Sequence, residues 1–143
     1  GYRRRLVRRH LADCFPEKDE AERRKIERGF YHWFCDYLVE TIKLFSMSER
    51  QIRRRMVFEG HEAINADFSK GQSVGLYLGH YCNWEWITSL PLWTSPEGKC
   101  AQIYHPLENV WFDRLFLRLR ERFGAKCILL SETLRRLVGY RNE

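Results

Sequence analysis

A histidine and a glutamate five residues apart, His80 and Glu85, are the side chains best suited to chemistry. Across a turn from strand to helix, the carboxylate can accept the N–H of one imidazole nitrogen and leave the other nitrogen as a base. A substrate that supplies its own hydroxyl then needs no nucleophile from the protein. Gly79, just before the histidine, lets the backbone approach a reacting carbonyl closely. The spacing is equally compatible with a buried, hydrogen-bonded core histidine.

A second polar segment, residues 104–109, reads YHPLEN and follows another apolar run. His105 and Asn109 would meet the same crevice if both runs are parallel strands, because ligands bind beyond the carboxyl ends of such strands. A structural interpretation is also open. In that interpretation, Pro106 forms a turn and Asn109 caps the helix that follows.

The elements that must position these residues are those of an α/β fold. The sequence predicts strands at 73–79, 99–104 and 126–130, and residues 56–60 are also typical of a strand. Short helices are predicted at 62–68 and from residue 83, an amphipathic basic helix at 110–123 and a last helix at 132–140. This alternation implies right-handed crossovers and a mainly parallel sheet.

The first part of the chain is expected to be helical and basic. Apolar spacing predicts a short arginine-rich helix near residues 2–14, a long helix through residue 45, and a basic turn that Ser48 caps. We therefore predict a basic helical region at 1–55, followed by the first part of an α/β domain at 56–143.

Composition excludes several classes of protein. The chain has 143 residues, of which 44% are hydrophobic, and a formal charge of +6, so one modest domain with a real core is expected rather than a disordered tail. Glycines and a proline interrupt the longest stretch that is poor in charge, residues 71–96, which argues against a transmembrane helix there. Five separated cysteines form no C-x-x-C pair, which disfavours zinc and disulfides and favours small buried thiols.

The arginine runs are compatible with a solvated face, with nucleic acid or with an anionic membrane. Most aromatic residues fall at helical core spacing instead of alternating with the arginines, so no nucleic-acid partner is expected.

Several segments together resemble one family. Residues 8–18, RRHLADCFPEK, resemble the "RRNL…CFPE" segment of the bacterial lipid A late acyltransferases, the lauroyl and myristoyl transferases of the lysophospholipid acyltransferase superfamily. Residues 79–85, GHYCNWE, are similar to the family's "GHFGNWE" form of the H-x4-D/E motif. VFEGHE at 57–62, YHPLEN at 104–109 and RERFGA at 120–125 resemble further family segments in the same order.

The resemblance implies an acyltransferase in which His80 is the general base and Glu85 orients it. The hydroxyl of a lipid A precursor would attack a fatty acyl thioester on acyl carrier protein, or on coenzyme A, with no metal or other cofactor. The implied location is the cytoplasmic face of the inner membrane, where basic helices would meet anionic lipid and an acidic carrier. The residues expected to bind substrate are Gly79, Asn83, Tyr104, His105, Asn109, Asp113 and Arg114.

The sequence departs from the family pattern at three places. Tyr81 and Cys82 replace the commoner Phe-Gly, His105 replaces an arginine, and Val110 replaces a proline. Family members are also longer, so the chain is expected to be an N-terminal fragment with an incomplete sheet. Two alternatives remain open: an acyltransferase acting on another membrane lipid, such as a lysophospholipid, glycolipid or aminolipid, and a non-catalytic basic module that binds membranes.

Overall fold

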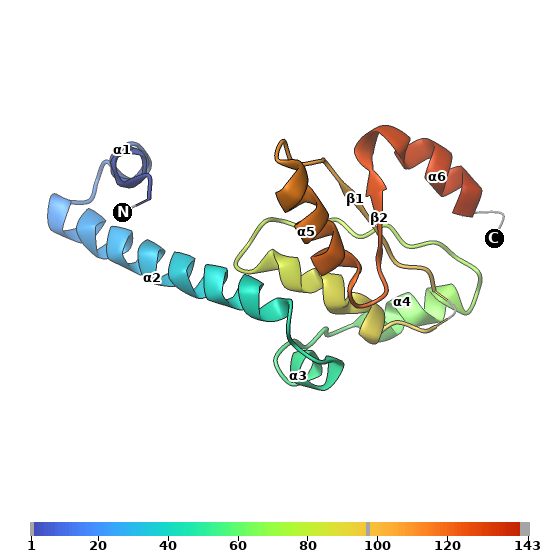
Figure 1. Ribbon diagram of the computed structural model, residues 1–143. Coiled ribbons are helices and arrows are strands. Elements are labelled where there is room, and N and C mark those ends of the chain that lie inside the picture. Colours follow the sequence, from blue (N-terminus) through green and yellow to red (C-terminus); the bar gives the residue numbers. More distant parts are fainter. Residues whose placement is uncertain (1, 97, 141–143) are drawn as a thin grey trace. The chain divides into compact units, whose positions relative to one another are not determined.

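The computed structural model describes residues 2–96 and 98–140 and shows a mainly helical chain with one small parallel sheet (Figure 1). The α-helices are α1 (Arg4–Cys14), α2 (Glu20–Leu44), α3 (Glu49–Arg53), α4 (His61–Phe68), α5 (Val110–Glu121) and α6 (Thr133–Tyr140). Two 3-10 helices, η1 (Trp84–Leu92) and η2 (Leu130–Glu132), and two strands, β1 (Ala101–Tyr104) and β2 (Lys126–Leu129), complete the fold. Among the described residues, no helix is both long and apolar enough to cross a membrane.

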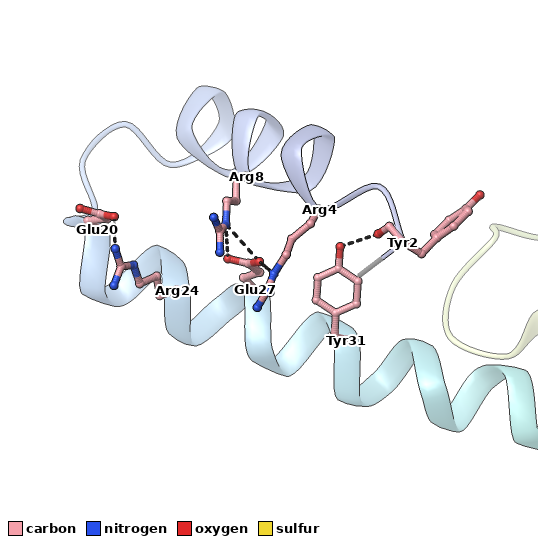
Figure 2. Close-up of polar contacts among 7 residues, drawn as sticks. All are labelled: Tyr2, Arg4, Arg8, Glu20, Arg24, Glu27 and Tyr31. Carbon is pink, nitrogen blue, oxygen red and sulfur yellow. Dashed lines mark hydrogen bonds and ion pairs between the residues drawn. The ribbon is translucent and has the colours of Figure 1, made fainter.

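The chain divides into two compact units, the first ending at Ile42 and the second beginning at Lys43. In the first unit, α1 is tied to α2 through Glu27, which is only 3% exposed. Arg4 Nε donates to Glu27 Oε1 at 2.8 Å and Arg8 Nε donates to Oε2 at 2.9 Å (Figure 2). The hydrogen bond from Arg8, followed by that from Arg4, lowers the pKa of Glu27. A buried carboxylate between two guanidinium groups therefore sets the side of α2 on which α1 lies.

The core of the second unit joins segments that are distant in the sequence. Leu44, Met47 and Ile52 pack with Leu119 and Phe123, all buried. Arg122 supports this packing, because its guanidinium donates to the backbone oxygen of Leu44 at 2.7 Å and to that of Met47. The end of α2 and the turn into α3 thus belong with α5 rather than with α1.

The sheet has the parallel pairing expected of an α/β fold. β1 and β2 pair in register from Ala101 opposite Lys126 to Tyr104 opposite Leu129. Helix α5 connects the two strands, and it packs against β2 and η1 (Figure 1). The predicted strands near 99–104 and 126–130, and the helix between them, are confirmed with small changes of boundary.

Two other strand predictions are wrong. Residues 56–60 and 73–79 form no strand, and the second segment is exposed throughout, with Tyr77 at 95%. An apolar run indicates that a segment tends to be buried. A strand also needs a second strand whose backbone C=O and N–H groups pair with its own. In the described part of the chain the sheet contains only β1 and β2, which pair with each other. The α/β class is confirmed, and the sheet is narrower than the pattern indicated.

Two details also differ from expectation. The helix predicted from residue 83 is a 3-10 helix that includes Pro91. The cysteines are less buried than predicted, because Cys14, Cys35 and Cys82 are exposed and Cys100 and Cys127 are half-buried. Three of the five thiols therefore contribute little to any core.

Candidate active site

His80 lies in the extended segment that leads into η1, and its side chain is exposed. The imidazole packs edge to face on the indole of Trp84, with the ring centroids 4.5 Å apart. Gly79, also exposed, precedes it. The imidazole is thus accessible to a substrate and is steadied on one side by an aromatic ring.

Glu85 occupies the opposite kind of environment. It is 1% exposed, and both carboxylate oxygens accept hydrogen bonds from Arg120 of α5. Arg120 Nη2 lies 2.7 Å from Oε1, and Nε lies 3.1 Å from Oε2. This two-point contact between planar groups is the strongest geometry of an arginine and a carboxylate, and it gives each of the two buried charges a hydrogen-bonded partner of opposite sign.

Trp84 contacts both parts of this arrangement. The Arg120 guanidinium lies 5.5 Å from the centre of a Trp84 ring, and His80 packs against the same side chain. Among the described residues, the ring contact of His80 is with Trp84, and the hydrogen bonds of Glu85 are with Arg120. The structure therefore brings the predicted pair into one neighbourhood without a hydrogen bond between imidazole and carboxylate.

The backbone beside His80 has an unusual conformation. Cys82 has φ of 49°, in the left-handed region that favours glycine. This is the position at which the sequence has cysteine in place of the glycine of the resembling motif. A residue other than glycine costs about 1–2 kcal/mol in the left-handed conformation. The rest of the turn into η1 therefore holds Cys82 in a conformation that its own backbone disfavours.

The second predicted segment lies at the carboxyl end of β1. Tyr104 ends the strand, and burial, followed by the charge of Asp113, raises the pKa of its hydroxyl. His105 is exposed, with Nδ1 3.0 Å from the backbone oxygen of Pro106. Tyr104 and His105 thus lie at the end of the strand as predicted, but in the described structure no hydrogen bond, ion pair or ring contact joins them to His80 or Glu85.

Asn109 and Asp113 hold the start of α5. Asn109 Oδ1 accepts the backbone N–H groups of Trp111 at 3.0 Å and Phe112 at 3.1 Å, which confirms the predicted N-cap. Asp113 Oδ1 accepts the Leu107 N–H at 2.9 Å. Both side chains thus fix the loop between β1 and α5, whatever further role they have toward a substrate.

Asn83 and Arg114 complete the predicted set. Asn83 is the N-cap residue of η1 and its backbone oxygen accepts the Trp86 N–H at 3.2 Å. Arg114 is exposed on α5. Their expected roles in substrate binding remain predictions.

Arg120 is the site residue that sequence reasoning missed. It begins the RERFGA segment that contributed to the resemblance, but no pattern linked it to Glu85, 35 residues earlier. The apolar surroundings of Glu85 in the sequence could have indicated such a partner, because a glutamate that is buried in an apolar helix needs a cationic side chain beside it.

The chain is similar to proteins of one family. Residues 2–143 match the family described as "Bacterial lipid A biosynthesis acyltransferase". Over 126 residues the chain is 28% identical to the lipid A biosynthesis myristoyltransferase of Escherichia coli (strain K12), and equally to lipid A biosynthesis acyltransferase 1 of Shigella flexneri. Each match covers 87% of this chain and 37% of the relative, so the chain spans well under half the length of these curated relatives. No solved structure matches the chain.

Proposed function

Because the chain belongs to the bacterial lipid A biosynthesis acyltransferase family, we propose that it carries the catalytic base of an enzyme that acylates a lipid A precursor. The observation that supports this most directly is local. The exposed imidazole of His80 packs on Trp84, and the Arg120 guanidinium, which holds the buried Glu85 carboxylate at two points, lies against the same tryptophan. An accessible base beside a fixed anionic group is the arrangement that activation of a hydroxyl requires.

In the proposed reaction, a nitrogen of His80 takes the proton of the acceptor hydroxyl as its oxygen attacks the carbonyl carbon of a fatty acyl thioester. The new C–O bond forms, the C–S bond breaks, and the departing thiolate receives the proton from the imidazolium. The products are an ester on the lipid and a free thiol on the carrier. The proposed carrier is acyl carrier protein, with coenzyme A as the alternative donor. His80 alone transfers the proton in this reaction, so the proposal includes no resident cofactor.

Glu85 is proposed to orient His80 during this reaction. Its carboxylate has about four lone-pair positions, and Arg120 uses two of them. An imidazole N–H therefore has an acceptor available on the same carboxylate if the ring turns from Trp84 toward Glu85. Arg120 would then be a positioning residue, because it fixes Glu85 rather than touching the substrate.

The proposed location is the cytoplasmic face of the inner membrane. The formal charge of +6 suits both an anionic lipid surface and an acidic carrier protein. The lipid acceptor would reach His80 from that surface.

An assay of transfer tests this function. The purified protein is incubated with a lipid A precursor and a donor, either acyl carrier protein loaded with a fatty acid or acyl coenzyme A. The mass of the lipid product is then measured by mass spectrometry. We expect one added acyl chain, lost in His80→Ala and retained in His10→Ala, a matched control because His10 is exposed on α1. Acylation of a lysophospholipid or aminolipid alone would contradict the acceptor, and transfer that survives His80→Ala would contradict the base.

A further inference from the structure

Helix α5 has two different faces. Its inner face carries Leu119 of the core and Arg120, which holds Glu85. With 3.6 residues per turn, Val110, Trp111, Arg114 and Arg118 fall together on the opposite side, which we term the outer face of α5. All four are exposed, Val110 at 62% and Trp111 at 66%. The helix that carries the buried ion pair therefore also presents a surface with an apolar end and a basic end.

The two acids of α5, Asp113 and Glu121, hydrogen-bond to backbone groups rather than to the arginines of this face. Asp113 accepts the N–H of Leu107, and Glu121 Oε1 accepts the N–H of Cys127 at 2.9 Å. Within the described part of the chain, Arg114 and Arg118 form no ion pair. Two guanidinium groups are thus available to an external anion.

The apolar end of the face lies next to the predicted substrate segment. Val110 follows the cap Asn109 directly, and Trp111 packs edge to face on Phe112, with ring centroids 5.1 Å apart. Leu107 and Phe112 extend this exposed apolar area at the carboxyl end of β1. A tryptophan flanked by aliphatic and basic side chains is typical of surfaces that lie in the headgroup region of a bilayer.

We propose that the outer face of α5 rests on an anionic bilayer, with Val110 and Trp111 in the headgroup region and Arg114 and Arg118 against lipid phosphates. The inference rests on the proposed function, which requires a lipid acceptor, and it names the surface through which the site meets the membrane. Apolar and aromatic exposure favours lipid over an acidic protein, because charge attraction to a protein would not require Val110 and Trp111 to be exposed.

Vesicle binding tests the proposal without any acyl donor or acceptor, so its result does not depend on transfer. Binding of the purified protein is measured by co-sedimentation with phosphatidylcholine vesicles that contain or lack phosphatidylglycerol. The double variant Arg114→Gln/Arg118→Gln is expected to bind the anionic vesicles about tenfold or more weakly. The matched control, Arg50→Gln/Arg54→Gln, removes the same charge from exposed arginines at α3 and is expected to bind like wild type.

Insertion is measured separately with vesicles of brominated lipid, which quench nearby tryptophans. We expect quenching in wild type and markedly less in Trp111→Phe, while Trp111→Ala also weakens binding. Equal loss in both arginine double variants, or quenching unchanged by Trp111→Phe, would overturn the proposal. If the double variant Arg114→Gln/Arg118→Gln loses binding to acyl carrier protein but still binds the vesicles, the outer face of α5 binds a protein, and the proposal is overturned as well.

Discussion

Arg120 and Glu85 are 35 residues apart in the sequence, yet the guanidinium of one closes on both oxygens of the other at 2.7 and 3.1 Å. The pair ties α5 to η1, and hence to the segment that carries His80. It is an ion pair almost removed from solvent, with 2% of the Glu85 side chain and 13% of the Arg120 side chain exposed. The position of the candidate base therefore depends on a long-range contact within the second unit.

Replacing Arg120 with leucine is expected to destabilise the fold strongly. The substitution leaves the buried Glu85 carboxylate without its partner, which costs about 3–5 kcal/mol in such cases. Urea denaturation of Arg120→Leu against wild type measures the loss. Arg114→Gln, on the exposed side of the same helix, is the control and is expected to change stability by less than about 0.5 kcal/mol. Equal stability of Arg120→Leu and wild type would contradict the ion pair.

Acid is expected to loosen α1 from α2. Arg8 and Arg4 lower the pKa of Glu27 below its ordinary value, so the folded state favours the carboxylate. The resulting stability is present above the ordinary pKa of glutamate, near 4.3, and is lost as the pH falls through the lowered value. Amide hydrogen exchange in α1, followed from pH 6 downward, measures this. In Glu27→Gln the protection should be lower at pH 6 and change less with acid; an unchanged profile would refute the assignment.

Asn109 is expected to contribute to stability through its cap. Asn109→Ala removes the acceptor of two backbone N–H groups, which costs about 1 kcal/mol, whereas Asn109→Asp keeps it. Thermal unfolding of the two variants compares them directly. If both lose the same stability, the cap is not the cause.

Cys127 is expected to react slowly with thiol reagents. Burial, followed by the nearby charge of Glu121, raises the pKa of its thiol to about 11, so less than about one per cent is thiolate at pH 8. Cys14, Cys35 and Cys82 are exposed and should be alkylated first. Peptide mass spectrometry after brief treatment with iodoacetamide gives the order. Labelling of Cys127 at the rate of Cys14 would show that it is neither buried nor shifted.

Local patterns predicted much of this fold. The long helix α2, the helix α5 with its cap Asn109, and the strands β1 and β2 all follow from periodicity and terminal residues. Each of these signals lies within the element it describes. The parallel pairing then follows because a helix connects the two strands.

What the sequence did not reveal depends on distant partners. The run 73–79 has the composition of a buried strand, but pairing is a property of two segments, and this one has no strand neighbour in the described chain. Glu85 was predicted as the partner of His80 because the two are close in sequence, whereas its hydrogen bonds go to Arg120. Sequence proximity thus predicted a contact between His80 and Glu85 and missed the contact between Glu85 and Arg120.

The most direct test of the central claim is a double-mutant cycle of single-turnover acyl transfer with His80→Ala, Glu85→Gln and the two combined. If the imidazole is the base and Glu85 acts through it, His80→Ala lowers the rate about 100-fold or more, and adding Glu85→Gln lowers it little further. Circular dichroism of each variant verifies that the fold is kept. Losses that multiply in the double variant, or a rate unchanged by His80→Ala, would contradict the account.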